Sequence, residues 1–433
     1  MNRTLFSLVI GAGLLGRVAV GHAQEVTSAV EGPGFEVSEN TVFHPVLGID
    51  IGGTNNVFYR SSNFNGSGLL RLIAEGSLAS KKVEAPGPAE AWVGGDDEQV
   101  AEPAPRAIEF RAGGALAYTE YLSGDSVIRS QRNLGADLGA NLVVFPQGTA
   151  AFKLDERFIR YTAPTNFLSD EDTDRITNAI GLGLYYQPGG RTMRGSIRFE
   201  NQIDVFEEDA QRFDNRMINA ILASYEWEFF PYSKVYADFS YSFITGLGDS
   251  GAIPTLKQDA QPIRGGAGIA TSITELFTVK AYFGWAHASY ENGPSYNTPV
   301  LGAEVGYRYS PLGRAVVAYA WDHRDSLNAQ FYSDHGFTLR VDQQIDRFIA
   351  SAGAEVHLRT YEGIPMEIGP PTRSDVIVAG LIRANYVFKD WIAAVATFRA
   401  ETDQTDYRSD FGGDLDNPSY SRFELTGGVR TAF

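Results

Sequence analysis

The sequence of 433 residues contains no cysteine. This excludes a disulfide framework, thiol catalysis and a cysteine-ligated metal centre. Beyond the N-terminus the chain also lacks any apolar run of 18 or more residues, the length that a membrane-spanning helix needs. The formal net charge is -17, which disfavours nucleic acid as a partner because an acidic chain repels phosphate.

Motifs of soluble enzymes are scarce. The segment 47–55, LGIDIGGTN, is similar to the phosphate-binding start of a class of sugar kinases, but no alternation of helix and strand patterns follows it. The six histidines show no close metal-ligand spacing, and no G-x-S-x-G element accompanies the many Ser and Asp residues. We therefore assign no catalytic, cofactor-binding or metal-binding residue and expect no cofactor.

Glycine and aromatic residues are abundant: 46 Gly, 27 Phe and 21 Tyr, in a chain whose hydrophobic fraction is an ordinary 43%. Such a composition is typical of a barrel in which each strand has one apolar face. A soluble all-β protein could share this composition, so the two kinds of fold have to be distinguished by the order of the residues.

The N-terminus is typical of a secretory signal peptide. A short basic start precedes an apolar run from Leu5 to Val20, and Gly21-His22-Ala23 forms a small-x-small cleavage site. We predict a signal peptide over 1–23, followed by a flexible periplasmic segment over 24–41. The absence of cysteine suits a chain that crosses an oxidising periplasm unfolded.

From residue 42 onward the hydrophobic pattern has a period of two. Between 277 and 290, one face carries Phe277, Val279, Ala281, Phe283 and Trp285, and the other carries Thr278, Lys280, Tyr282, Gly284 and Ala286. Side chains alternate across a strand, so this pattern predicts a strand that is apolar on one side only. Several such runs reach the nine to eleven residues that a membrane strand needs.

The links between these runs alternate in length. Short turns rich in Pro and Gly occur at 146–148, 188–190, 231–233 and 311–313, and longer polar loops occur at 163–171, 246–259, 291–298, 361–374 and 402–418. Short periplasmic turns opposite long external loops are expected of outer-membrane barrels. The count predicts an all-β fold, a transmembrane antiparallel up-and-down barrel over 42–433 with about 18 strands (16–18). An acidic insertion at 79–105, which its place in the order of links puts on the periplasmic side, interrupts this alternation of short and long links.

A sheet survives in lipid only when it is closed, and at this strand number an aqueous lumen is expected. The polar faces of the predicted strands would then line that lumen. Our candidates for its selectivity are Arg157, Arg198, Glu200, Asp238, Lys280, Glu304, Arg308, Arg340, Asp342, Glu355, Arg359, Arg383 and Arg399. Tyr236 and Tyr282 on the same face would suit either stacking on sugars or packing.

Phe423, Leu425, Val429 and Phe433 share one face of the last predicted strand, and Phe433 is the final residue. We interpret Phe433 as a membrane-insertion signal, which makes the outer-membrane insertion machinery an expected partner.

The first predicted strand runs from His44-Pro45 to Val57-Phe58 and resembles the opening strand of the family known as β-barrel porin 2. That family's strand runs from a Pro into an Asp-Asn followed by a hydrophobic pair, whereas the first of those two positions here is Asn55. Members often accompany polysaccharide secretion, so the resemblance implies passage of polysaccharide across the outer membrane and a periplasmic export protein as a partner.

These observations favour a non-enzymatic channel, a porin or an export pore, in the outer membrane of a Gram-negative bacterium. Its surroundings would be outer-membrane lipid and lipopolysaccharide. Two alternatives stay open: an outer-membrane enzyme resembling a lipase or protease barrel, and a plugged structural or adhesive barrel.

Overall fold

The structure is a computed structural model that describes residues 30, 32–38, 41–80, 107–162, 174–188, 192–248, 259–327, 329–364, 370–405, 407–408 and 417–433. The predicted signal peptide and residues 81–105 of the predicted acidic insertion lie outside the described residues. Residues 79 and 80 are the last two of a strand, so the insertion cannot begin before residue 81.

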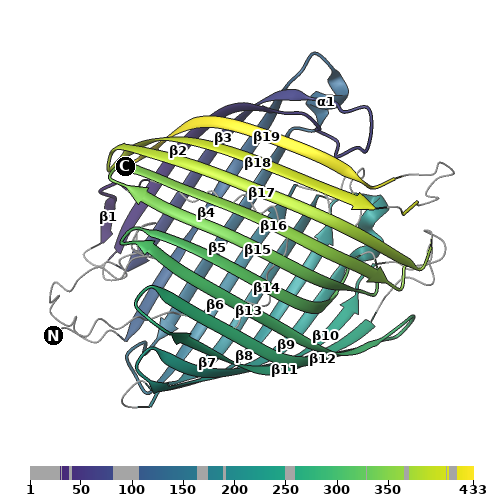
Figure 1. Ribbon diagram of the computed structural model, residues 1–433. Helices are drawn as coiled ribbons and strands as arrows, with labels where there is room; N and C mark the ends of the chain where they lie inside the picture. Colours follow the sequence, from purple (N-terminus) through teal and green to yellow (C-terminus); the bar gives the residue numbers. More distant parts are fainter. Residues whose placement is uncertain are drawn as a thin grey trace.

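Eighteen antiparallel strands, β2 to β19, follow one another around a closed barrel (Figure 1). Each strand pairs with its neighbours in the sequence, and β19 pairs back with β2 through nine residue pairs, from Glu424↔Thr54 to Ala432↔Val46. The strands are β2 (Thr41–Thr54), β3 (Ser67–Ser80), β4 (Ile108–Leu122), β5 (Asn133–Val144), β6 (Ala150–Tyr161), β7 (Arg175–Tyr186), β8 (Met193–Phe206), β9 (Arg216–Phe230), β10 (Ser233–Gly246), β11 (Asp259–Ser272), β12 (Phe277–Tyr290), β13 (Tyr296–Ser310), β14 (Gly313–Asp325), β15 (Phe331–Ile345), β16 (Phe348–Glu362), β17 (Thr372–Lys389), β18 (Ile392–Thr405) and β19 (Tyr420–Ala432). The predicted fold class and strand number are confirmed.

The predicted alternation of tight and long links is present. At one end, four hairpins have two-residue turns, at 231–232, 311–312, 346–347 and 390–391. Tyr232 and Asp346 adopt positive φ there (66° and 51°), as two-residue hairpins commonly require. The opposite end carries the longer links, including the one between β4 and β5 with helix α1 (Ser126–Ser130) and the one between β8 and β9 with the 3-10 helix η1 (Asp209–Asp214). We call these the tight-turn end and the loop end.

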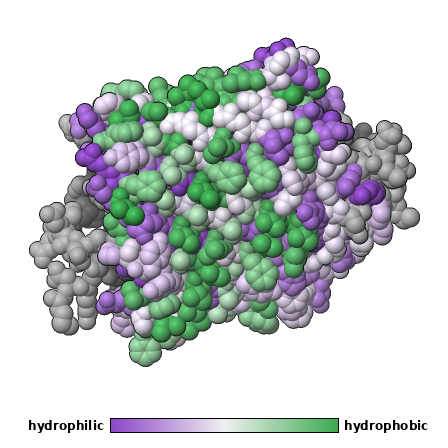
Figure 2. Space-filling model, turned by 45° about the horizontal axis from the view of Figure 1, so that its top comes forward, coloured by the Kyte–Doolittle hydropathy of each residue, from purple (hydrophilic) through white to green (hydrophobic). Residues whose placement is uncertain are grey.

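The outer surface of the barrel is apolar. Register places residues such as Leu47, Ile197, Phe283, Leu339 and Ile382 outside, and all of them are exposed. Figure 2 shows apolar side chains gathered across the face of the barrel. An aromatic girdle lies beside the tight turns and comprises the exposed side chains of Phe145, Tyr186, Phe230, Tyr309 and Phe388. An apolar band with an aromatic rim is the surface that a membrane-spanning barrel presents to lipid.

Part of the segment predicted to be flexible is held against the barrel. Phe35–Ser38 form a short strand, β1, that pairs with the start of β2. The N–H groups of Gly32 and Gly34 donate to the carbonyl oxygens of Asp390 and Phe433. A Cβ on Gly32 would lie 2.9 Å from the carbonyl carbon of Ala432, and its φ is +68°, so glycine permits this close approach. Backbone pairing at the rim thus orders residues for which the sequence predicted no structure.

Helices play a minor part in the described residues. Neither α1 nor η1 is long and apolar enough to cross a membrane, and the described residues contain no other candidate helix.

Candidate channel lining

Side chains along each strand alternate between the two faces of the sheet. The residues of the inner wall can therefore be identified by this alternation, which we call the inward and the outward parity. Outward positions carry the exposed hydrophobic side chains, so the residues between them point inward. All thirteen sequence-predicted lining residues fall on the inward parity: Arg157, Arg198, Glu200, Asp238, Lys280, Glu304, Arg308, Arg340, Asp342, Glu355, Arg359, Arg383 and Arg399. This parity places them on the inner side of the sheet, whereas their contact with the open lumen and their effect on selectivity stay predictions.

Many wall charges form ion pairs between neighbouring strands. On β5 and β6, Nη2 of Arg157 lies 2.7 Å from Oδ2 of Asp137. Nη2 of Arg198 on β8 lies 3.0 Å from Oδ2 of Asp155 and 2.7 Å from Oε2 of Glu200. These contacts leave the β5–β8 wall hydrated and close to neutral.

The same arrangement continues on the next strands. Lys280 and Glu304 are directly opposite each other on β12 and β13, with Nζ and Oε1 2.7 Å apart. Lys234 and Glu226 pair across β10 and β9 at 3.0 Å. Opposite charges facing each other across a sheet stabilise the pairing of the strands, so these residues also maintain the register of the wall.

A group of arginines, here called the basic strip, lies on the tight-turn half of the inner wall. It consists of Arg308, Arg314, Arg340 and Arg383 on β13, β14, β15 and β17. Arg308 and Arg314 are directly opposite each other, an arrangement of like charges that costs stability. Asp342 lies within the strip: its Oδ2 accepts from Nε of Arg340 at 2.9 Å, and its backbone pairs with that of Arg314. We expect the strip to raise the electrostatic potential of this sector of the lumen.

Arg359 is on the inward parity but does not line open space. Only 1% of its surface is exposed, and its neighbour His357 is fully buried. The guanidinium lies 4.4 Å from the ring centroid of Tyr332 and 3.3 Å from Oδ2 of Asp334, which also contacts Nδ1 of His357 at 2.9 Å. Arg359, which we predicted to line the lumen, is instead buried beneath the rings of Tyr332 and Tyr361.

A second buried charge group lies beside it. Nε of Arg373 donates to Oδ1 of Asp375 at 2.7 Å, and Nη2 lies 3.5 Å from Oδ2 of Asp403. The Arg373 guanidinium also lies over the rings of Tyr361 and Tyr407, 5.5 and 5.8 Å from their centroids. Burial raises the pKa of Tyr407 to about 12, so its hydroxyl stays neutral at physiological pH.

The link that carries η1 folds toward this region from the other side of the barrel (Figure 1). Phe213 packs against a buried cluster that consists of Ala329, Tyr332, Tyr361, Ile364 and Tyr407. Arg216, at the start of β9, pairs with Asp325 at the end of β14 and with Asp204 on β8 at 2.9 Å. Because β9 and the η1 link thereby contact elements five or more strands away, they narrow the loop end of the lumen.

Aromatic packing also fills one corner of the lumen. Tyr282 is 5% exposed and belongs to a buried cluster with Tyr290, Tyr296 and Phe331. Tyr236 stacks on Tyr282 with centroids 6.2 Å apart. Of the two roles predicted for these tyrosines, the structure thus supports packing for Tyr282, because a buried ring cannot stack on a passing sugar.

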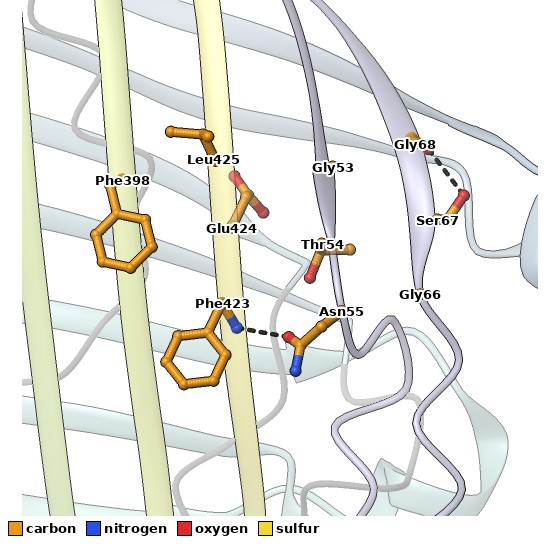
Figure 3. Close-up of a pocket in the computed structure, with 10 residues that line it drawn as sticks. All are labelled: Gly53, Thr54, Asn55, Gly66, Ser67, Gly68, Phe398, Phe423, Glu424 and Leu425. Atoms are coloured by element: carbon orange, nitrogen blue, oxygen red, sulfur yellow. Dashed lines mark hydrogen bonds between the residues drawn. The ribbon is translucent and has the colours of Figure 1, made fainter.

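The structure also has a groove, but it lies on the outer wall. Figure 3 shows Phe398, Phe423 and Leu425 on one side of it, with Gly53, Gly66 and Gly68 forming the other side. The N–H of Phe423 donates to Oδ1 of Asn55 at 2.6 Å, which fixes the loop-end rim of the groove. Since its aromatic residues are on the outward parity, the groove faces the membrane and takes no part in the lumen.

Comparison with known proteins gives matches at the level of solved structures. Neither a family model nor a curated protein matches the sequence. A mutant of the ferric enterobactin receptor of Pseudomonas aeruginosa is 8% identical, with 90% of this chain and 80% of that chain covered and a TM-score of 0.45. OccK2 (OpdF) of the same organism, solved with glucuronate, is 11% identical over 90% and 98%, with a TM-score of 0.46. The FrpB iron transporter of Neisseria meningitidis is 9% identical over 92% and 82%, with a TM-score of 0.46. At such scores, the assignment of the fold rests on the strand pairing of this chain.

Proposed function

We propose that this protein is an outer-membrane channel for hydrophilic solutes. The observation that carries the proposal is the division of the wall: an apolar outer face and an inner face with ionisable side chains of both signs on most strands. Charged groups need water or partners, and an 18-strand barrel is too wide for its own wall residues to fill. A water-filled passage that narrows toward the loop end meets both conditions.

The basic strip supports a preference for anionic solutes. Arg340 is 52% exposed, so its guanidinium reaches solvent in the lumen. Rings of charged side chains select ions in many channels. Small anions, including acidic sugars, are therefore the solutes for which we expect the highest permeability.

Polysaccharide passage is a second candidate. It is supported by the resemblance of the opening strand to that of β-barrel porin 2. The solute would then be an extended sugar chain delivered by a periplasmic export protein, and the constriction at the loop end would have to open. Loss of surface polysaccharide in a deletion strain, restored by the intact gene, would favour this candidate over a passive pore.

Single-channel recording tests the main proposal. The refolded protein, inserted in a planar bilayer, is expected to give steady currents with anion selectivity, and an acidic oligosaccharide is expected to reduce them. A correctly folded barrel that never conducts would overturn the proposal and favour the plugged barrel. Turnover of a lipid or peptide substrate by the purified protein would favour the enzyme.

A further inference from the structure

Four polar residues interrupt the apolar outer wall. They are Glu156 on β6, Asn178 on β7, Asn201 on β8 and Asn219 on β9, and we call them the polar band. Each shares the outward parity of exposed apolar residues on its own strand, such as Phe152, Leu182, Phe199 and Ile221. Because the four strands are consecutive, the band forms one continuous feature of the membrane-facing surface.

Two members of the polar band lie unusually far from the ends of their strands. Glu156 and Asn201 are at least five residues from either end of β6 and β8. Among the strands that the structure describes, no other outward position at least five residues from both strand ends carries a charged or amide side chain. Polar outward residues on other strands, such as Glu120 and Gln261, lie two residues from a strand end, where the membrane surface supplies water.

The four side chains form two pairs. Nδ2 of Asn178 donates to Oε1 of Glu156 at 3.3 Å, and Nδ2 of Asn201 donates to Oδ1 of Asn219 at 2.9 Å. An amide has two N–H donors and a carboxylate accepts several hydrogen bonds. These two bonds therefore leave several donors and acceptors of the band without a partner inside the wall. On the outer side, lipid offers neither donors nor acceptors.

We infer that the polar band is the centre of an interface with a second copy of this chain. A two-fold axis along the membrane normal reverses the order of strands in the partner, so that β6 faces β9 and β7 faces β8. Asn178 then faces Asn201 of the other copy, on both sides of the axis. Each of these amides can donate to the other and accept from it. The central pair is thus complementary to itself, as an isologous interface requires.

Cysteine cross-linking can test this pairing cleanly because the chain has no cysteine of its own. Ile180 is the best probe: it is the backbone partner of both Glu156 and Asn201, it is 42% exposed, and its replacement leaves all four polar residues in place. Val378 is the matched control, an apolar outward residue, 40% exposed, in the middle of β17.

With a short bis-maleimide in native membranes, we expect Ile180→Cys to give a product of twice the chain mass and Val378→Cys to remain monomeric. Adding Glu156→Leu and Asn201→Leu to Ile180→Cys should reduce the dimer at least five-fold. The shift in gel mobility on heating verifies that each variant folds. Equal cross-linking of the two probes, no cross-linking of a folded Ile180→Cys barrel, or a product whose mass shows a different protein would each overturn the inference. None of these results depends on whether the barrel conducts.

Discussion

At the scale of single residues, burial separates side chains that the sequence makes look alike. Arg340 and Arg359 both point inward, on the adjacent strands β15 and β16, and each contacts an aspartate on β15. Arg340 is half exposed, whereas Arg359 lies beneath Tyr332 and is almost completely buried. Arg340 is therefore accessible to solutes, whereas Arg359 stabilises the wall.

Alanine substitutions at these two arginines should therefore differ in their effect on stability. Arg359→Ala leaves the buried Asp334 carboxylate with a weaker set of partners, and breaking a buried pair costs about 3–5 kcal/mol. Arg340→Ala removes an exposed pair, for which roughly 0–1 kcal/mol is expected. Urea unfolding of the barrel reconstituted in liposomes measures both free energies. Equal losses of unfolding free energy for the two variants would show that Arg359 stabilises the barrel no more than Arg340 does.

At the scale of elements, the strands could be predicted and the constriction could not. Alternation assigns each residue of a strand to one face, and the faces predicted for 277–286 are the faces observed. The link at 207–215 has no periodicity, and Phe213 packs against a cluster whose residues are all more than a hundred positions away. Alternation likewise places Arg359 on the inner face but does not show that the rings of Tyr332 and Tyr361 cover it.

Phe213 offers a way to test what the η1 link does. Phe213→Asp would place a carboxylate among the rings of Tyr332, Tyr361 and Tyr407. Burying this charge costs free energy, and the link can avoid that cost by moving away from the cluster into water. We expect a larger single-channel conductance with the ion selectivity retained. Arg212→Ala is the control, because Arg212 is adjacent and exposed. An unchanged conductance for Phe213→Asp would mean that the narrowest part of the passage lies elsewhere.

At the scale of the whole molecule, the inner wall mixes both charge signs although the chain carries a formal net charge of -17. Carboxylates and cations alternate on β5–β8 and on β9–β13, while the basic strip is concentrated on β13–β17. We expect the strip to make its sector the more positive side of the lumen, so that a passing solute experiences a field directed across the barrel.

Reversing two charges of the strip should change the selectivity of the molecule. In Arg340→Glu with Arg383→Glu, the reversal potential under a salt gradient should shift toward that of a cation-selective pore. Arg340→Lys keeps the charge and should leave the potential unchanged. The shift should be largest near 0.1 M salt, where the Debye length is about 10 Å, and small at 1 M, where it is about 3 Å. A reversal potential insensitive to the double substitution would contradict the role of the strip.

The pairing of β19 with β2 has a consequence for biogenesis. Arg430 and Asp50, which bridge the two strands through hydrogen bonds of 2.6 and 2.9 Å, are 380 positions apart. Until β19 has been synthesised and delivered, β2 has an unpaired edge that can template association with another chain. The barrel therefore cannot close until its last strand has been made, and up to that point the edge of β2 is open to pairing with another copy of the chain.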